Sequence, residues 1–332
     1  MAGEPERPGA PGLASETWES TNPKKPREET ASVNPLAPGL YLVATPIGNL
    51  GDITLRALEV LRGVDRIACE DTRQTQKLLN HFQIATPTLS CHEHNERERA
   101  AELVESLKSG ARIALVSDAG MPGISDPGAW LAAAAIAAGV QVFPIPGANA
   151  ALSALVASGL PAAEFHFLGF LPEKAGARRT RLEDLARESQ KSTQTSGHAS
   201  GPTLIFYEAP HRIAETLADL EAVWGPELRV VVARELTKLH EEFVRGTVSE
   251  VRQNLASRDR IRGEITLIVE PPAEGKVSSS TAPHETLADR VARMQSEAGI
   301  DEKEALKRLA RELGQSKSDL YRELQRARAR RR

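Results

Sequence analysis

The sequence has little of several features that would decide its class at once. It holds 2 cysteines in 332 residues, too few for the disulfide framework of a small secreted protein. No apolar run approaches the ~20 residues of a membrane helix, and the N-terminal segment lacks the basic and apolar regions of a secretory signal. Neither G-x-G-x-x-G nor the P-loop pattern occurs, which argues against a dehydrogenase and against an NTPase. We expect the protein to reside in a reducing cytoplasm.

Charge is divided unevenly along the chain. The formal net charge is −3, but residues 283–332 hold 13 Lys and Arg against 9 Asp and Glu, which leaves +4 there and −7 on the rest. From Arg322 to the end of the sequence, several residues are arginine and the one acidic residue is Glu323. A basic segment on an acidic body indicates a polyanionic partner. A solvated helix end, where cations complement the helix dipole, explains the segment equally well.

The first part of the chain predicts one α/β domain behind a disordered leader. Residues 1–38 contain seven prolines and no hydrophobic periodicity, which is typical of disorder. From Gly39 onward short β-type runs alternate with helical stretches, and this predicts βαβ units in a mostly parallel sheet over residues 39–150. The predicted strands are 40–45, 64–70, 88–91, 111–117 and 140–145, and the helices are 54–62, 72–82, 95–108, 129–138 and 148–158.

A second α/β domain is predicted over residues 151–271. Its strands are expected at 165–170, 203–208, 228–235, 241–246 and 263–270, with helices at 177–188 and from Ile213. Because strands follow one another near its end, we expect a mixed sheet with an antiparallel portion. Residues 191–202 are typical of a mobile surface loop. The lone His166 is expected to be packed rather than catalytic.

The remainder predicts a linker over 272–283 and a helical basic module over 284–332. Asp301 and Glu304 resemble a capping box for one helix, and Ser316 with Asp319 would cap the last. Such a module is compatible with nucleic-acid docking, and equally with packing or dimerisation.

Three Pro- and Gly-rich loops follow predicted strands, at 44–50, 117–123 and 144–150. In a parallel sheet, ligands collect where strand ends meet helix starts. Small residues there let a ligand lie against the backbone, and Asp118 can accept hydrogen bonds from a ribose or an amine. Each loop alone is explained by an ordinary strand-to-helix turn. Together they predict one crevice that handles a nucleotide or a cofactor.

Charged residues follow two more strands of the first domain. Glu70–Arg73 could grip a substrate or activate a hydroxyl, while Asp71 or Thr72 would equally cap the next helix. Residues 91–96, CHEHNE, contain metal-ligating types but not the spacing of a zinc site. We therefore predict no metal, and a substrate-binding loop with Asn95 as a helix cap.

Charged residues also follow two strands of the second domain, at Tyr207–Arg212 and Arg234–Glu242. Arg and Lys at strand ends suit phosphate binding. A solvated loop would carry the same residue types, so both interpretations stay open.

Ten segments of this chain, taken in order, carry a family resemblance. They are LVATPIGNLGDITLRALEVL, IACEDTRQTQKLL, CHEHNE, ALVSDAG-x-P-x-ISDPG, FPIPGANA, ASGLP, FLGFLP, YEAPHRI, RELTKLHEEFVRG and GEITLIVE. Together they resemble the ribosomal RNA small subunit methyltransferase I family, which is similar in fold to the tetrapyrrole methylases. The resemblance runs from about Gly39 to Glu270, and GQSKSDLYREL near the end is similar to the family's C-terminal extension.

The resemblance implies two α/β domains with S-adenosylmethionine (SAM) held in a cleft between them, and a homodimer. It implies 2′-O-methylation of a cytidine in the decoding region of 16S rRNA within the small ribosomal subunit. Met121 and Asn149 depart from the family pattern, where Thr and Ser or Thr are usual. The implied cofactor contacts are Pro46, Ile47, Gly48, Ser117, Asp118, Ala119, Gly120, Pro122, Ser125, Asp126, Pro146, Gly147, Asn149, Ala150, Tyr207, Glu264, Ile265 and Thr266.

A ribose hydroxyl is a poor nucleophile until its proton leaves, so a positioned base is expected to help. The candidates for this base are Glu70, Asp71, Glu235 and Lys238. The candidates for RNA contact are Arg73, His92, Arg212, Arg234 and Lys238. Two other functions stay open: SAM-dependent methylation of a small tetrapyrrole, and a non-catalytic ribosome assembly factor. The basic module favours RNA over a tetrapyrrole, and intact cofactor loops favour an enzyme over a binding factor.

Overall fold

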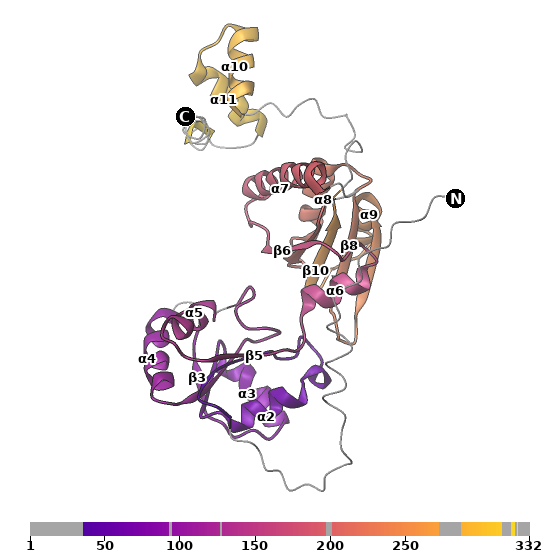
Figure 1. The fold of residues 1–332 in the computed structure, drawn as a ribbon. Helices are drawn as coiled ribbons and strands as arrows, with labels where there is room; N and C mark the ends of the chain where they lie inside the picture. Colours follow the sequence, from indigo (N-terminus) through magenta and orange to yellow (C-terminus); the bar gives the residue numbers. More distant parts are fainter. Residues whose placement is uncertain are drawn as a thin grey trace, which may run out of the picture. The chain divides into compact units, whose positions relative to one another are not determined.

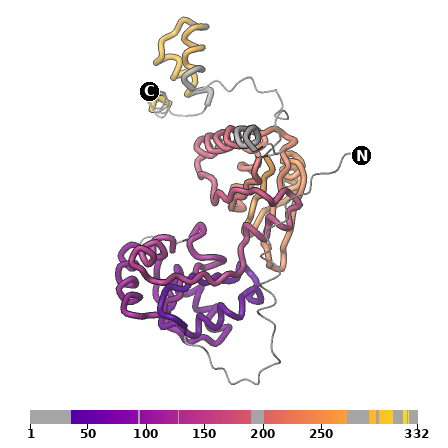
Figure 2. Tube along the Cα trace, viewed as in Figure 1, coloured from indigo at the N-terminus to yellow at the C-terminus, as the bar shows by residue number. Residues whose placement is uncertain are grey.

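The structure is a computed structural model that describes residues 36–92, 95–126, 128–196, 201–271, 287–313, 320–322 and 324 (Figure 1, Figure 2). The chain divides into two compact units. The first contains the chain up to Val43 together with Thr54–Asp118 and Pro127–Ile145. The second contains Ala44–Ile53, Ala119–Asp126 and the chain from Pro146 onward. Two loops that leave strands of the first sheet thus belong to the second unit.

The first unit is built on a five-stranded sheet in the order β3-β2-β4-β1-β5, and every pair of neighbours is parallel. The parallel sheet predicted from the alternating pattern is therefore confirmed. The strands are β1 (Gly39–Val43), β2 (Arg66–Cys69), β3 (Thr88–Ser90), β4 (Arg112–Val116) and β5 (Val142–Ile145). The helices are α2 (Leu55–Gly63), α3 (Thr72–His81), α4 (Glu96–Lys108) and α5 (Ala129–Ala137), with a short 3₁₀ turn η1 at Leu50–Asp52.

Helices cover both faces of this sheet, as parallel strands require. Leu103 of α4 and Leu131 of α5 pack in one cluster with Leu40 and Leu115 of the central strands. The α2 and α3 helices lie together on the other side (Figure 1). The buried strand residues explain why the segments carry continuous apolar runs rather than an alternating pattern.

Side-chain caps explain where two of these helices begin. Thr54 accepts a hydrogen bond from the Ala57 N–H at the start of α2, and Asp71 accepts one from the Arg73 N–H at the start of α3. The predicted cap at Asp71 is thus confirmed. Asn95 occupies the predicted cap position of α4, but its Oδ1 atom accepts from the His92 N–H at 2.9 Å and not from the helix. Asn95 therefore stands at the N-cap position of α4 without making a side-chain cap hydrogen bond.

The second unit carries a mixed sheet in the order β6-β7-β10-β8-β9. Its strands are β6 (Phe165–Phe170), β7 (Thr203–Glu208), β8 (Arg229–Arg234), β9 (Glu242–Thr247) and β10 (Ile265–Glu270). The β6 and β7 strands are parallel, whereas β10 runs antiparallel to β7 and β8, and β9 antiparallel to β8. The predicted mixed sheet is confirmed. The helices are α6 (Ala150–Ser158), α7 (Ala175–Ser196), α8 (Ile213–Trp224) and α9 (Val248–Ala256).

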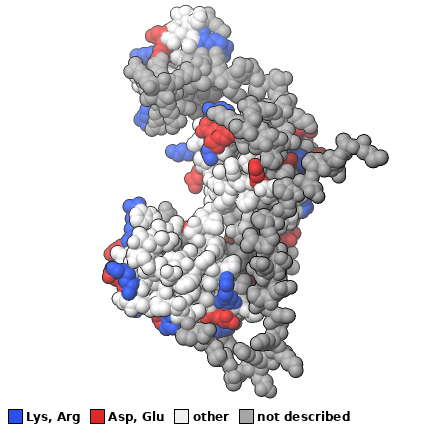
Figure 3. Space-filling model, in the orientation of Figure 1, with Lys and Arg blue, Asp and Glu red and all other residues white. Residues whose placement is uncertain are grey.

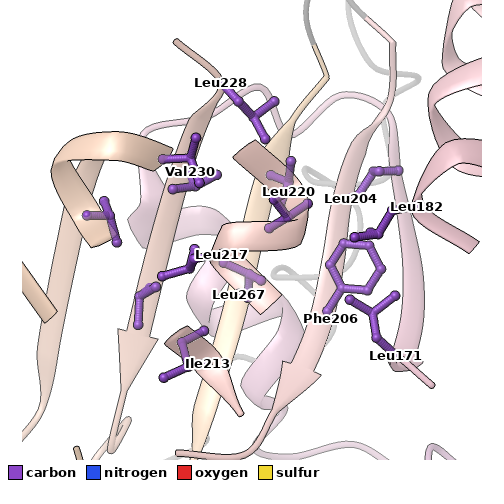
Figure 4. Close-up of a cluster of buried hydrophobic side chains, with 14 of the residues drawn as sticks. Leu171, Leu182, Leu204, Phe206, Ile213, Leu217, Leu220, Leu228, Val230 and Leu267 are labelled. Atoms are coloured by element: carbon purple, nitrogen blue, oxygen red, sulfur yellow. The ribbon is translucent and has the colours of Figure 1, made fainter. Parts of the chain in front are cut away.

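Alternation along the strands separates the two faces of this sheet. Leu204 and Phe206 of β7 point to a large apolar cluster with α7, α8 and α9, where Leu217 and Leu220 meet Leu267 (Figure 4). Ile205 points the other way, to a cluster with Ala154 and Leu155 of α6. Tyr207, two residues beyond Ile205, lies on the face that α6 covers.

Three local expectations for this unit were wrong. The α9 helix, which separates β9 from β10, was missed although Thr247 and Glu250 form a complete capping box at its start. The α7 helix extends to Ser196 and replaces the first part of the predicted loop, while 197–200 lie outside the described residues. His166 is exposed on the edge strand β6 and is not packed.

The C-terminal module contains α10 (Leu287–Ala298) and α11 (Glu302–Leu313). Val291, Leu306, Leu309, Leu320 and Leu324 form its small apolar core, which confirms the predicted helical module. The Asp301 carboxylate accepts a hydrogen bond from the Glu304 N–H at 2.7 Å and so caps α11. Ser316, Asp319 and the arginines after Arg322 lie outside the described residues, as do the leader up to residue 35 and the predicted linker.

Candidate functional site

A cavity of about 210 Å³ lies within the second unit. Its walls are largely apolar, with a small number of carboxylate, amide and hydroxyl groups, which is the usual composition of a small-molecule site. The lining residues are Ile47, Ala119, Gly120, Met121, Ile124, Ser125, Asp126, Asn149, Ala150, Phe170, Tyr207, Glu208, Ala233, Leu236, Glu264, Ile265 and Thr266. We call this cavity the pocket.

The three predicted loops do meet at this pocket, through Ile47, Ala119–Met121 and Asn149–Ala150. Two backbone hydrogen bonds join the first loop to the second: the Thr45 N–H donates to the Gly120 carbonyl at 2.9 Å, and the Gly120 N–H donates to Thr45 at 3.1 Å. The third loop passes so close to the first that a Cβ atom on Gly147 would lie 2.8 Å from the Ala44 Cβ atom. The small residues in these loops therefore serve close packing of one loop on another.

The opposite wall comes from neighbouring strands of the second sheet. Thr266 of β10 pairs with Tyr207 of β7 in the antiparallel register, and Ala233 of β8 pairs with Thr266 on its other side. The Phe170 ring lies against Tyr207 with a centroid distance of 5.8 Å. Burial and the charge of Asp126 raise the pKa of Tyr207 although a hydrogen bond from the Ala151 backbone lowers it. Tyr207 is therefore a neutral phenol at neutral pH.

Glu208 at the end of β7 is a buried carboxylate whose hydrogen-bonding capacity is used within the fold. Its oxygens accept from the Ala209 N–H at 2.8 Å and from the Thr216 hydroxyl at 2.6 Å. Arg212 lies 3.2 Å from the same carboxylate and donates to the Leu171 carbonyl at 2.7 Å. These contacts fix the turn between β7 and α8, which forms one corner of the pocket.

The predicted cofactor residues divide into two groups. Eleven of them line the pocket: Ile47, Ala119, Gly120, Ser125, Asp126, Asn149, Ala150, Tyr207, Glu264, Ile265 and Thr266. Seven do not: Pro46, Gly48, Ser117, Asp118, Pro122, Pro146 and Gly147. Of these, Ser117 and Asp118 belong to the first unit, where the Asp118 carboxylate accepts a hydrogen bond from the Asp71 N–H at 3.3 Å.

Six lining residues were not in the predicted site: Met121, Ile124, Phe170, Glu208, Ala233 and Leu236. Ala233 lies on the same face of β8 as Val231, which packs against α6, but alternation along the strand does not show that this face lines a pocket. Met121 and Ile124 lie inside the second loop and are simple neighbours of predicted residues. Phe170 carries no sequence signal, since an aromatic residue at a strand end is common.

A second cluster of charges lies beside Glu264 at the pocket. The Lys238 ammonium donates to the Glu235 carboxylate at 2.8 Å and to the Glu264 carboxylate at 2.9 Å. The Lys238 hydrogen bond lowers the pKa of Glu235. Burial lowers the pKa of Lys238, but its hydrogen bonds to Glu235 and Glu264 outweigh burial and raise it. The three groups therefore form a hydrogen-bonded triad, in which Glu235 and Lys238 are ionised at neutral pH.

The backbone around this triad is strained. Glu235 and Thr237 adopt left-handed φ angles of 53° and 65°, a region that non-glycine residues seldom occupy. Two glycines permit the arrangement: a Cβ atom on Gly263 would lie 2.3 Å from the Glu235 side chain, and one on Gly48 would lie 2.5 Å from Lys238 Cγ. Gly48, which does not line the pocket, thus accommodates the lysine stem.

The other predicted bases and RNA contacts lie outside the pocket lining. The Asp71 carboxylate accepts from the Arg73 guanidinium at 2.8 and 3.0 Å, and Arg73 lowers the pKa of Asp71 to about 2. Arg234 donates to the Glu242 carboxylate at 3.0 Å and to the Arg262 carbonyl at 3.1 Å. Glu70 and His92 are both half-buried at the ends of the first unit's strands. Arg73, with 88% of its side chain exposed, is far more open than Arg212 or Arg234, at 13% and 18%.

The described residues contain no group of three or more His, Cys, Asp or Glu placed to hold a metal ion. They also contain no helix long and apolar enough to cross a membrane.

Comparison with known proteins places this architecture in a family. The sequence pattern of the tetrapyrrole (corrin/porphyrin) methylases matches residues 39–252. The ribosomal RNA small subunit methyltransferase I of Halalkalibacterium halodurans is 48% identical over 288 residues, which cover 85% of this chain and 93% of that protein. The protein of the same name from Bacillus subtilis is 45% identical over 283 residues, which cover 85% of this chain and 92% of its own.

A likeness of fold alone is shown by the crystal structure of a conserved hypothetical protein from Aeropyrum pernix K1. It has a TM-score of 0.53 at 18% identity and covers 72% of this chain and 86% of that one. The α/β fold class and the family resemblance predicted from ten ordered segments are both confirmed. This chain belongs to the ribosomal RNA small subunit methyltransferase I family, on the two-domain fold of the tetrapyrrole methylases.

Proposed function

We propose that this protein transfers the methyl group of SAM to the ribose 2′-oxygen of a cytidine in 16S rRNA, at cytidine 1402. The observation that supports the proposal most strongly is the convergence of three loops and four strands on one pocket, in a chain that belongs to a methyltransferase family. The relatives named ribosomal RNA small subunit methyltransferase I indicate the small-subunit RNA as the substrate.

The residues of the pocket fit SAM. Asp126 and Glu264 supply negative charge for a ligand that carries a sulfonium and an ammonium group. Ile47 and Leu236 supply apolar surface for an adenine ring, and Asn149 stands at the start of α6. When bound, SAM supplies an electrophilic methyl group that an oxygen nucleophile can accept.

The loops can contribute to the reaction by holding that ligand in one orientation. The paired hydrogen bonds between Thr45 and Gly120, and the close contact of Gly147 with Ala44, leave these loops little freedom. Preorganised orientation is one of the largest available contributions to a displacement reaction. We propose that the loops position the methyl group and that the RNA supplies the aligned hydroxyl.

The pKa shifts of three of the four predicted bases make them unsuited to accept a proton. They favour a role for these residues in positioning. An efficient general base has a pKa near the working pH. Asp71 has a pKa of about 2, and that of Glu235 is lowered, so both carboxylates are weak proton acceptors. Lys238 has a raised pKa and is protonated. We propose that these residues hold the site and the RNA in place, and that Glu70 is the remaining candidate base.

The proposal also includes action in the cytoplasm and as a homodimer, both of which the family resemblance implies. Sedimentation equilibrium of the full chain tests the dimer directly. A single species at the mass of the 35.9 kDa monomer across micromolar concentrations would exclude it.

The experiment that tests the proposed reaction is transfer of labelled methyl from SAM to small ribosomal subunits that lack this modification. We expect label on a single ribose 2′-oxygen, at a cytidine. Label on a base, or transfer to a tetrapyrrole instead of RNA, would overturn the proposal. SAM binding without any transfer would instead favour a non-catalytic assembly factor that keeps the ligand for structural reasons.

A further inference from the structure

Two arginines of the described chain lie over aromatic rings, and the two pairs differ in what else the arginine does. The Arg245 guanidinium lies 4.7 Å from the Phe243 centroid and also donates to the carbonyls of Ala157 and Ser158 at 2.7 and 3.2 Å. The Arg97 guanidinium lies 4.8 Å from the Trp130 centroid. Within the part of the chain that the structure describes, no carboxylate lies within ion-pair distance of Arg97. Arg245 thus joins two parts of the fold. The Arg97 guanidinium can still donate hydrogen bonds to a ligand.

Trp130 is unusual for its exposure. The chain has three tryptophans; Trp224 is 4% exposed in the core, while Trp130 is 55% exposed, and Trp18 lies outside the described residues. Aromatic residues make up only 4% of the sequence. An exposed indole beside a cation that pairs with no described carboxylate is typical of a binding surface rather than of a packing element.

The backbone that carries this indole is held firmly. A single oxygen of Glu96 accepts hydrogen bonds from the N–H groups of Gly128, Trp130 and Leu131, at 2.9, 3.0 and 3.1 Å. Glu96 is 7% exposed, and Leu131 on the inner side of α5 is fully buried. The carboxylate thus caps the start of α5 from the neighbouring helix. The exposed ring is presented by a rigid support, which lowers the entropy cost of binding through it.

The chemistry of the pair points to nucleic acid. A flat indole and a flat guanidinium offer stacking surface to a nucleobase, and the guanidinium adds a positive charge and donors for a phosphate. The acidic neighbour Glu96 does not cancel this charge at the surface, because its carboxylate is buried under α5. The face of the first unit where α4 lies carries Lys and Arg side chains among acidic ones (Figure 3).

We propose that Arg97 and Trp130 form a stacking platform for an unpaired base of the RNA substrate. The inference rests on the proposed function and adds a second point of contact to it. The platform binds RNA by stacking on Trp130 and by contact of Arg97 with the adjoining phosphate. It contributes to affinity for RNA and leaves affinity for SAM unchanged.

The test compares Trp130→Ala and Arg97→Gln with a matched control, Arg99→Gln. Arg99 lies on the same helix and carries the same charge, but it is paired with Glu102 at 2.6 Å. We expect the first two variants to weaken binding to unmodified small subunits about fivefold to a hundredfold, the range of one lost base–aromatic stack. KM for the subunit should rise with kcat unchanged, Trp130→Phe should restore most of the affinity, and Arg99→Gln should change it less than about twofold.

A spectroscopic reading supports the assignment independently. A single-stranded RNA of twelve nucleotides should quench the fluorescence of the wild-type protein, and Trp130→Phe should abolish the quenching. Equal losses in Arg97→Gln and Arg99→Gln would show a general charge effect and overturn the proposal. Altered self-association of Trp130→Ala with wild-type RNA affinity would assign the surface to a second copy instead. Wild-type protein that methylates no RNA would overturn the proposed function, whereas active wild type with unaffected variants would overturn the platform alone.

Discussion

The two sheets of this protein supply the pocket in different ways. The first sheet contributes none of its own strand residues. It contributes through the loops that follow β1, β4 and β5, at Ala44–Ile53, at Ala119–Asp126 and from Pro146, which all belong to the second unit. The second sheet contributes strand residues directly, among them Tyr207, Ala233 and Thr266. Parallel strands end at one edge, where loops are free to vary, while a mixed sheet presents a fixed face. One part of the site therefore depends on how loops pack together, and the other on the integrity of a folded sheet.

The largest expected effect comes from removing a buried ion pair between α7 and α8, outside the pocket. Arg178, only 1% exposed, bonds to the buried Asp219 at 2.7 Å, between α7 and α8. Arg178→Ala should lower the free energy of unfolding by about 3–5 kcal/mol, because it removes one partner of a buried ion pair. Urea denaturation measures this value. SAM affinity of the protein that remains folded should equal that of wild type.

Arg179→Ala is the matched control, since Arg179 also bonds to Asp219 at 2.6 Å but is 62% exposed. It should cost no more than about 1 kcal/mol. Equal losses in the two variants would show that burial does not decide the strength of this cluster.

The next effect comes from forcing the loops apart. Gly147→Val places methyl groups where a Cβ atom already lies 2.8 Å from Ala44. We expect SAM affinity to fall at least about tenfold, equal to about 1.4 kcal/mol, with a loss of thermal stability that is small beside that of Arg178→Ala. Isothermal titration calorimetry measures the affinity.

Gly51→Ala supplies the control for the loop variant. It lies in the first loop, where an added Cβ atom meets only the exposed Asn49 side chain, at 3.2 Å. It should leave SAM affinity within about twofold of wild type. A similar loss in both glycine variants would mean that loop flexibility, and not the contact with Ala44, controls binding.

A smaller effect on the free energy of unfolding should appear when the Glu242 carboxyl, on the edge strand β9, is protonated. Glu242 of β9 accepts from Arg258 at 2.6 and 2.8 Å and from Arg234, and Arg258 is the main cause that lowers the pKa of Glu242 to about 2. A carboxyl with a depressed pKa stabilises the fold above its unfolded pKa, and this contribution is lost as pH falls through the folded pKa.

Glu242→Gln should therefore cost about 1–2 kcal/mol at pH 7, allowing for solvent screening at a partly exposed group. The difference from wild type should shrink as pH falls from the ordinary 4.5 toward about 2. Stability curves at several pH values measure it. A difference that is constant with pH would assign the loss to packing and not to charge.

The same contrast between loops and strand faces explains how much could be predicted. The loop residues were found because Pro and Gly mark a turn after an apolar run, and a parallel sheet gathers such turns at one edge. Met121 was noted as a departure from the family pattern but was not included among the predicted contacts, and Ile124 resembles an ordinary apolar residue of the loop. Gly48 was predicted as a cofactor contact but does not line the pocket. Its proximity to Lys238 spans 190 residues of chain, and no local pattern encodes it.

Residues on the strand faces were harder to predict for a physical reason. A strand in a mixed sheet with helices on both sides is apolar on both faces, so alternation does not reveal which face carries a ligand. Tyr207 and Thr266 entered the predicted site through the family resemblance, and Ala233 did not enter it at all. The α9 helix was missed although its capping box was present, because its nine residues follow directly on β9 with no break.

The smallest expected effect concerns two charged residues that were predicted as candidate bases. Loss of a true general base costs about 10²–10⁴-fold in rate. Because Asp71 has a pKa of about 2 and that of Glu235 is lowered by Lys238, both are poorly suited to that role. Asp71→Asn and Glu235→Gln should reduce kcat less than about tenfold.

Single-turnover methylation at saturating SAM and subunit isolates this step from binding. The profile of rate against pH should keep its wild-type shape in both variants, whereas Glu70→Gln should lose a limb if Glu70 accepts the proton. A hundredfold loss in Glu235→Gln with SAM and RNA affinities intact would contradict this assignment. It would mean that the triad with Lys238 and Glu264 opens when RNA binds, which frees the Glu235 carboxylate and brings its pKa toward neutrality. The triad would then act as a switch, and the strained backbone at Glu235 and Thr237 would be the segment that moves.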